Sequence, residues 1–208
     1  MKRMSVANEL EREPSVTDGL GLLDTDSVHT FFDEYHSLLK GMGVTGVKVD
    51  AQSIVPALVA GSSGGWERAL AFHKGLKASV SKHFDRTGGG EHNIIHCMCH
   101  SHHILLSIAT LYTSSGSSSG RRGLPVIRGS DDFWPLEDAS HGPHLFINSL
   151  NSLFFPHLGL HDWDMFQTDL GRSSALHAAS RAISGGPVYV SDRPGTHSGA
   201  ILRKLAFA

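Results

Sequence analysis

Apolar residues along the chain alternate between helical spacing and short β-branched runs. Apolar side chains recur every three or four positions over residues 28–39, Asp26 or Ser27 precedes them as a plausible N-cap, and Gly41 ends the run. This spacing predicts an amphipathic helix. Residues 43–50, GVTGVKVD, follow with the length and β-branched content of a strand. A helix and a strand therefore form the first unit of the predicted fold.

The same unit recurs along the rest of the chain. The patterns predict helices over residues 66–84, 102–112, 144–155 and 174–183, and strands over residues 93–100, 124–132, 158–164 and 186–192. Strands separated by helices pair in parallel, because each return crossing needs about a dozen residues or more. The sequence therefore predicts the α/β class, with about five strand units.

Two polar segments lie outside this alternation. Residues 1–26 carry alternating charges, so we expect an irregular N-terminal segment. Residues 113–122, TSSGSSSGRR, are too polar to bury surface, so we expect a disordered insertion between a helix and a strand. A linker between domains is the competing interpretation, which the resumed alternation disfavours. Residues 27–208 are thus predicted to form one domain.

Composition limits the partners and the location of the protein. Of the 208 residues, 40% are hydrophobic and 18% charged, which is enough apolar material for a core. A net charge of −2 provides no basic surface, so nucleic acid is not expected as a partner. Cys97 and Cys99 are too close for an unstrained bridge, and no export signal or membrane-spanning run is evident. We therefore expect a cytoplasmic protein with reduced thiols and no membrane contact.

Four of the five predicted strands end in aspartate. These residues are Asp50, Asp131 with Asp132, Asp162 with Asp164, and Asp192. The carboxyl ends of parallel strands collect at one face, where active sites form, so a ring of carboxylates is expected there. The alternative for each aspartate alone is that it caps a helix or closes a turn.

Two carboxylates beside a sugar are the minimal equipment for cleaving a glycosidic bond. Lys48 projects to the same side of its strand as Asp50, where a cation keeps the carboxylate ionised and can bind sugar hydroxyls. Arg128 precedes the acidic pair and offers a fork for adjacent hydroxyls or a carboxylate. Trp134 and Trp163 lie beside the acids and suit the apolar faces of sugars, although packing is the commoner use of tryptophan.

Four motifs carry a resemblance to a known family. They are GVTGVKVDAQS at 43–53, IRGSDDFWP at 127–135, HDWDMFQ at 161–167 and SRAISGGPVYVSDRPGTH at 180–197. In this order they closely resemble raffinose synthases, seed imbibition proteins and alkaline α-galactosidases of glycoside hydrolase family 36. The resemblance begins near Gly19 and implies a (β/α)8 barrel with retaining chemistry on α-galactosides.

The resemblance also implies roles for single residues. Asp50 is similar to the nucleophile that forms a galactosyl-enzyme, and Lys48 to its hydroxyl-binding neighbour. The acid/base lies in the R-x-S-D-D-F motif that begins at Arg128, where related galactosidases place it four residues after the arginine. This position is Asp132, and Asp131 is the alternative because other branches place the acid directly after the serine.

The remaining motifs imply contacts with substrate hydroxyls. Asp164 is similar to a substrate ligand in D-W-D-M-F, with Asp162 and Trp163 in support. The family's C-M-S-H segment is represented by residues 97–100, where Cys99 replaces the serine.

The resemblance implies α-galactosyl transfer from galactinol to sucrose, with hydrolysis of raffinose-type oligosaccharides as the alternative. These sugars are the expected partners, and no cofactor is expected. A (β/α)8 barrel takes about 250 residues, and the family's early strands have no counterpart before Gly19. We therefore expect a partial barrel truncated at its N-terminus, for which an inactive, sugar-binding fragment is a third interpretation.

A zinc-binding site is an alternative interpretation that would give the protein a different class of function. Cys97, Cys99, His100, His102 and His103 supply thiolate and imidazole ligands within seven positions. Structural sites space their cysteines by about two to four residues and draw ligands from separate segments. The pattern is therefore a poor match, and no metal is predicted.

Overall fold

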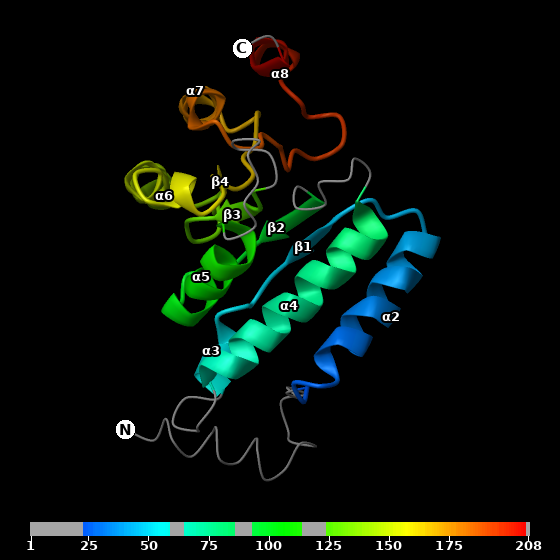
Figure 1. The fold of residues 1–208 in the computed structure, drawn as a ribbon. Helices are drawn as coiled ribbons and strands as arrows, with labels where there is room; N and C mark the ends of the chain where they lie inside the picture. The colour runs from blue at the N-terminus through cyan, green and yellow to red at the C-terminus, as the bar shows by residue number, and fades with distance from the viewer. Residues whose placement is uncertain (1–22, 59–64, 86–92, 114–123, 207–208) are drawn as a thin grey trace. The chain divides into compact units, whose positions relative to one another are not determined.

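The computed structural model describes residues 23–58, 65–85, 93–113 and 124–206, drawn in colour in Figure 1. The chain divides into two compact units, residues 1–125 and residues 126–208. Each unit holds a pair of parallel strands. Helices precede, separate and follow the pair in the first unit, and they separate and follow it in the second. The prediction of the α/β class is confirmed.

The first unit is built on one parallel strand pair. Its elements are α2 (Val28–Gly41), β1 (Val47–Val49), α3 (Ile54–Leu58), α4 (Gly65–Phe84), β2 (Ile94–His96), α5 (His102–Ile108) and the π-helical turn η2 (Ala109–Thr113). Val47 pairs with Ile94, and Val49 with His96. The helix expected over residues 102–112 is observed as the α-helix α5 followed by the π-helical turn η2.

The core of the first unit lies where α2 and α4 run side by side (Figure 1). Apolar side chains from both helices and from β2 form it, because each helix has one apolar face. The buried members are Val28, Phe32, Leu76, Val80, Phe84 and Ile94. A Cβ at Gly75 would lie 2.9 Å from Cγ1 of Val28, so this glycine permits the close approach of the helices.

Histidines are buried in this core. His36 shares a hydrogen bond of 2.9 Å with the Ser79 hydroxyl, which donates to the carbonyl of Phe32. The rings of His73 and His96 stack with centroids 5.5 Å apart, and both are about 1% exposed or less. Burial lowers the pKa of His73 to about 4. The pKa of His96 is also lowered, mainly by burial and in second place by the neighbouring His73.

We expect acid to destabilise the protein through these histidines. The unfolded chain takes up protons near pH 6.5, whereas folded His73 stays neutral down to about pH 4. The free energy of unfolding should therefore fall as pH drops through this window, by about 1.4 kcal/mol per pH unit for each histidine. Urea unfolding across the window measures the slope. His73→Phe should reduce this slope by the amount that corresponds to one proton, whereas His100→Gln, at an exposed position, should leave the slope unchanged. An unchanged slope in His73→Phe would contradict the role given to His73.

The second unit holds the other parallel pair. Its elements are β3 (Val126–Arg128), α6 (Asp138–Asn151), the 3-10 turn η3 (Phe155–His157), β4 (Leu160–Asp162), α7 (Arg172–Ser184) and α8 (Gly199–Ala206). Val126 pairs with Leu160, and Arg128 with Asp162. Phe133, Phe166 and Ala178 form a buried core, against which Val190 and, from α8, Ile201 pack.

The observed elements differ from the predicted ones in several places. The fifth predicted strand, 186–192, is reduced to a parallel bridge between Phe166 and Val190. Pro187 there has no N–H to donate, which disfavours a longer ladder. The helix expected to begin at residue 144 begins at Asp138 and contains Pro143, and the short helices α3 and α8 were not predicted.

Two predicted segments lie largely outside the described residues: 1–22 of the N-terminal segment and 114–122 of the Ser/Gly insertion. Within the described ranges, no helix has both the length and the apolar character needed to cross a bilayer.

Candidate functional site

Asp50 and Lys48 lie at the carboxyl end of β1. Lys48 is in the strand and Asp50 directly follows it, and both side chains are exposed. One carboxylate oxygen of Asp50 accepts a hydrogen bond of 2.7 Å from the N–H of Ala51. Ala51 has a positive φ of 55°, an uncommon conformation for alanine. Lys48 lines an open pocket over the strand pair together with Asn93 and Ile95.

The loop that carries Asp50 is fixed from both sides. The buried Gln52 side chain donates to the Val49 carbonyl at 2.8 Å, and Cys97 N–H donates to the same carbonyl at 2.8 Å. Ser53 donates through its N–H and its hydroxyl to the carbonyl of Met98, at 2.7 and 2.6 Å. The backbone around the predicted nucleophile is therefore well anchored, and Gln52 was not recognised from the sequence.

The cysteine and histidine cluster after β2 is not arranged as a metal site. Cys97 and Cys99 are buried and form no disulfide, and the Cys99 thiol donates to the His96 carbonyl at 3.5 Å. His100 and His102 are exposed. In the part of the chain that the structure describes, no three histidine, cysteine or acidic side chains are grouped so that they could hold a metal ion.

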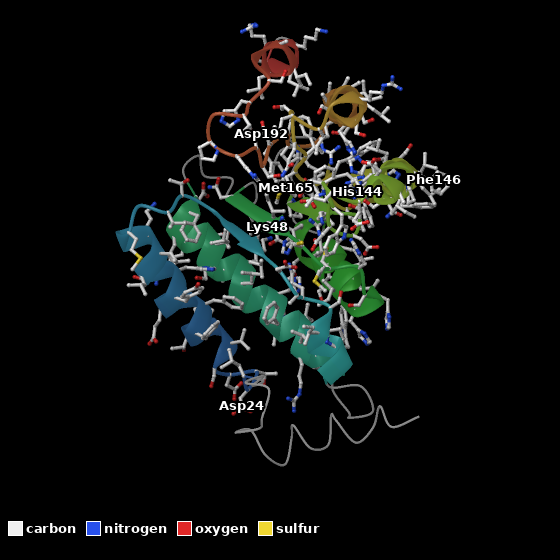
Figure 2. The ribbon with its side chains drawn as sticks, turned by 180° about the vertical axis from the view of Figure 1, so that it is seen from behind. Asp24, Lys48, His144, Phe146, Met165 and Asp192 are labelled. Carbon is white, nitrogen blue, oxygen red and sulfur yellow. The ribbon has the colours of Figure 1, made fainter. Side chains whose placement is uncertain are left out.

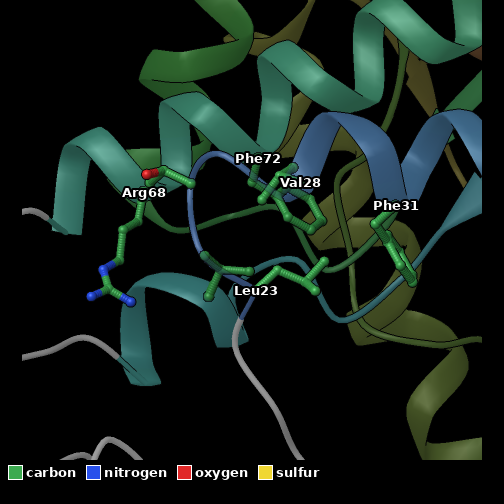
Figure 3. A pocket seen from close by; sticks show the side chains of 7 residues that line it. Leu23, Val28, Phe31, Arg68 and Phe72 are labelled. Carbon is green, nitrogen blue, oxygen red and sulfur yellow. The ribbon is translucent and has the colours of Figure 1, made fainter.

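The first unit also contains an apolar pocket of about 330 Å³ between α2, α3 and α4. Leu23, Val28, Phe31 and Phe72 form its apolar walls, and Arg68 extends away from them (Figure 3). None of the predicted site residues lines this pocket.

Arg128 organises the acids of the second unit. Arg128 is 2% exposed, and its Nε donates to the Ser130 carbonyl at 3.0 Å. One terminal nitrogen forms an ion pair of 2.7 Å with Asp164, and the other pairs with Asp132. The Asp132 side chain is 67% exposed, whereas Asp131 is exposed with no ion pair to a described residue. The buried guanidinium therefore holds the Asp132 carboxylate in place, while most of the Asp132 side chain stays exposed.

Asp162 and Asp164 are buried and accept several hydrogen bonds. The Tyr189 hydroxyl donates to Asp162 at 2.9 Å and approaches Asp164 at 3.4 Å. Asp162 also accepts the N–H of Asp164, and Asp164 accepts the N–H of Phe133, both at 2.9 Å. Burial and then Asp162 raise the pKa of Tyr189, so its hydroxyl stays a donor at neutral pH. A substrate hydroxyl would have to share these oxygens.

Arg181 on α7 holds the backbone that carries these two acids. Its side chain is completely buried, and it donates to the carbonyls of Trp163 and Asp164 at 2.9 Å and of Met165 at 3.0 Å. Asp164 has a positive φ of 64°, a conformation that these hydrogen bonds support. Burial lowers the pKa of Arg181 to about 10, which leaves the guanidinium charged at neutral pH.

A chain of histidines supports Arg181. Arg181 donates to Nδ1 of His177 at 2.9 Å, and Nε2 of His177 lies 3.0 Å from Nδ1 of His141. Because arginine only donates, we assign the hydrogen of His177 to Nε2, which then donates to His141. Burial and then Arg181 lower the pKa of His177 to about 3, so the ring is neutral.

The tryptophans and Asp192 occupy different environments. Trp163 is 6% exposed and donates its ring N–H to Ser152 at 3.1 Å, so its indole offers little free surface to a sugar. Trp134 is 58% exposed. Asp192 accepts two hydrogen bonds from Thr168, at 2.6 and 2.7 Å, and therefore closes a loop, which was the alternative considered for such residues.

Thus the structure brings Arg128, Asp132, Asp162 and Asp164 into one network in the second unit. Asp131 and Trp163 adjoin it, while Lys48 and Asp50 share the end of β1 in the first unit. Their predicted roles stay predictions. Sequence reasoning missed Arg181 and Tyr189. The signal for Arg181 was its spacing of four from His177, which puts two polar side chains on the buried face of one helix.

Comparison with known proteins identifies the family. The family described as raffinose synthase or seed imbibition protein Sip1 matches residues 4–208. A protein named probable galactinol–sucrose galactosyltransferase 1, from Arabidopsis thaliana, is 40% identical over 193 residues, which are 93% of this chain and 23% of that protein. Galactinol–sucrose galactosyltransferase from Oryza sativa subsp. japonica is 34% identical over 206 residues, 95% of this chain and 24% of that protein.

A third relative is named for a related product. Stachyose synthase from Pisum sativum is 33% identical over 197 residues, 90% of this chain and 21% of that protein. The chain thus spans less than a quarter of the length of these curated relatives. The family match covers nearly every residue and confirms the resemblance carried by the four motifs: the chain belongs to the raffinose synthase and seed imbibition protein family.

Proposed function

We propose that the protein acts in retaining α-galactosyl transfer, with galactinol as donor and sucrose as acceptor. The observation that carries this proposal is the similarity along nearly the whole chain to proteins named for galactinol–sucrose galactosyl transfer. Neutral sugars are then the partners. The buried thiols of Cys97 and Cys99, which form no disulfide, fit a cytoplasmic location.

The proposal extends to the architecture. In a (β/α)8 barrel, catalytic side chains follow the carboxyl ends of parallel strands. Asp50 follows β1, Arg128 ends β3, and Asp162 ends β4. The positive φ values of Ala51 and Asp164 occur just after strands as well, where functional sites often store backbone strain. We therefore propose that the chain forms part of such a barrel.

The proposed chemistry is a double displacement. A carboxylate oxygen of Asp50 attacks the anomeric carbon of galactinol, the bond to the leaving oxygen breaks, and Asp132 gives that oxygen its proton. Asp132 then takes a proton from a sucrose hydroxyl, whose oxygen attacks the anomeric carbon and releases Asp50. Two inversions retain the α configuration. Lys48, Arg128, Asp162, Trp163 and Asp164 are assigned to substrate binding, directly or by positioning.

The test is to incubate the purified chain with galactinol, with and without sucrose, and to separate the products. Raffinose formed only with sucrose would support transfer. Galactose released in both mixtures would favour the alternative, an α-galactosidase that acts on raffinose-type oligosaccharides. Galactose binding without turnover would favour an inactive fragment, and a chain with neither turnover nor binding would overturn the proposal.

Substitution of the two neighbouring acids should separate their roles. Because Arg128 orients Asp132 and leaves Asp131 unpaired among the described residues, we expect Asp132→Asn to slow transfer from galactinol by roughly 10²–10⁴-fold. Asp131→Asn should have a much smaller effect. A galactoside with an acidic phenol as leaving group needs no protonation, so Asp132→Asn should still form the galactosyl-enzyme from it. The reverse pattern would assign the acid/base to Asp131.

A further inference from the structure

A pocket of about 250 Å³ opens beside the acids of the R-x-S-D-D-F motif, and all of its lining residues belong to the second unit. Trp134, Pro143 and Ile147 form its apolar side. Asp131 and Asp132 lie on its polar side. The pocket is smaller than the roughly 300–1,000 Å³ typical of sites for whole drug-sized ligands, so it suits one ring of a larger molecule.

Trp134 lines this pocket and is far more exposed than the residue before it. Trp134 is 58% exposed, whereas Phe133 is 7% exposed and packs in the core. An exposed indole next to two carboxylates provides an apolar face and hydrogen-bond acceptors at one place. A sugar ring has the matching features, because its C–H face is apolar and its hydroxyls project from the edge.

His144 adds a buried polar atom to the lining. The residue is 7% exposed, and its Nε2 lies 3.1 Å from the Trp163 carbonyl and 3.3 Å from a terminal nitrogen of Arg181. Its Nδ1 has no hydrogen-bond partner among the described residues. A buried ring nitrogen of this kind calls for a water or a hydroxyl as its partner, and either can donate or accept. Figure 2 shows His144 on the inner side of α6, with Phe146 pointing outward.

We infer that this pocket is the binding site for the sugar acceptor, an inference that rests on the proposed function. One ring of the acceptor stacks on Trp134, and its hydroxyls bind Asp131 and the polar lining. This position brings an acceptor hydroxyl to Asp132, which removes its proton as the oxygen forms the new bond to the anomeric carbon and the bond to Asp50 breaks. Water can use the same position, so occupation of the pocket by sugar decides between transfer and hydrolysis.

Trp134→Ala should therefore raise the KM for sucrose by about tenfold and lower the ratio of raffinose to free galactose made from galactinol. Trp134→Phe should restore much of both, because a phenyl ring also stacks. Phe146→Ala is the matched control: it removes an exposed aromatic ring from the same region, one that does not line the pocket. Its KM and product ratio should match those of the unaltered chain.

An unchanged sucrose KM and product ratio in Trp134→Ala would overturn the inference. Failure of the proposed function gives a different result, since the unaltered chain would then make neither raffinose nor galactose. The pocket can still be tested in that case by saturation-transfer NMR with sucrose. A sucrose signal that is lost in Trp134→Ala supports the pocket, and no signal with the unaltered chain overturns it.

Discussion

Asp50→Asn should abolish galactosyl transfer, lowering donor turnover by about a thousandfold or more. The amide cannot form the ester with the anomeric carbon on which the double displacement depends. Asp50 is exposed on an anchored loop, and the hydrogen bond it accepts from Ala51 is local. The substitution should therefore leave the fold intact, as circular dichroism and urea unfolding would show. The rate of galactinol consumption is the measurement.

Azide distinguishes a nucleophile from a residue that only binds substrate. In Asp50→Ala the small anion can occupy the vacated space and attack the anomeric carbon, which yields the β-galactosyl azide by a single inversion. Asp26→Asn, which alters an exposed acid before α2, should keep full turnover and yield no azide product. Donor turnover that survives intact in Asp50→Asn would remove the nucleophile assignment.

Periodicity predicted the long helices well and the strands less well. The predicted helix at residues 66–84 is observed as Gly65–Phe84, because apolar positions recur through five turns. Each strand has three residues, although the patterns suggested runs of seven to nine. The flanking residues have strand-like composition but turn away after the ladder, as Ala51, Met98 and Asp164 do with positive φ. Such turns depend on tertiary contacts that periodicity does not encode.

For the site as well, the sequence predicted the positions of the acidic residues but not their surroundings. Acids at strand ends could be located from the sequence because they follow β-branched runs. Their individual environments could not: Asp132 is exposed, Asp164 is 2% exposed, and Asp192 closes a loop with Thr168. These differences arise from Arg128, Tyr189 and Arg181, which reach the acids from positions up to dozens of residues away. Pairing across such separations is set by the fold.

Arg181→Met should be the most damaging single change to the stability of the second unit, lowering the free energy of unfolding by about 3–5 kcal/mol. Methionine fills similar space but donates no hydrogen bond. The carbonyls of Asp164 and Met165 would then lose this donor, and the Trp163 carbonyl would keep only its contact with Nε2 of His144. His177 would also lose its partner at Nδ1, and Asp164 would lose support for its positive φ.

Urea unfolding followed by tryptophan fluorescence measures this loss, because Trp163 is buried beside the arginine. Arg172→Met is the matched control, since Arg172 lies on the same helix, is exposed, and should change stability by about 0.5 kcal/mol or less. Arg181→Lys should recover only part of the stability, because one ammonium group cannot replace a fork that reaches three carbonyls at once. A free energy of unfolding of Arg181→Met within about 1 kcal/mol of that of the unaltered chain would contradict this prediction. The backbone around Asp164 would then be held by the other contacts of Asp164, chiefly with Arg128 and Tyr189.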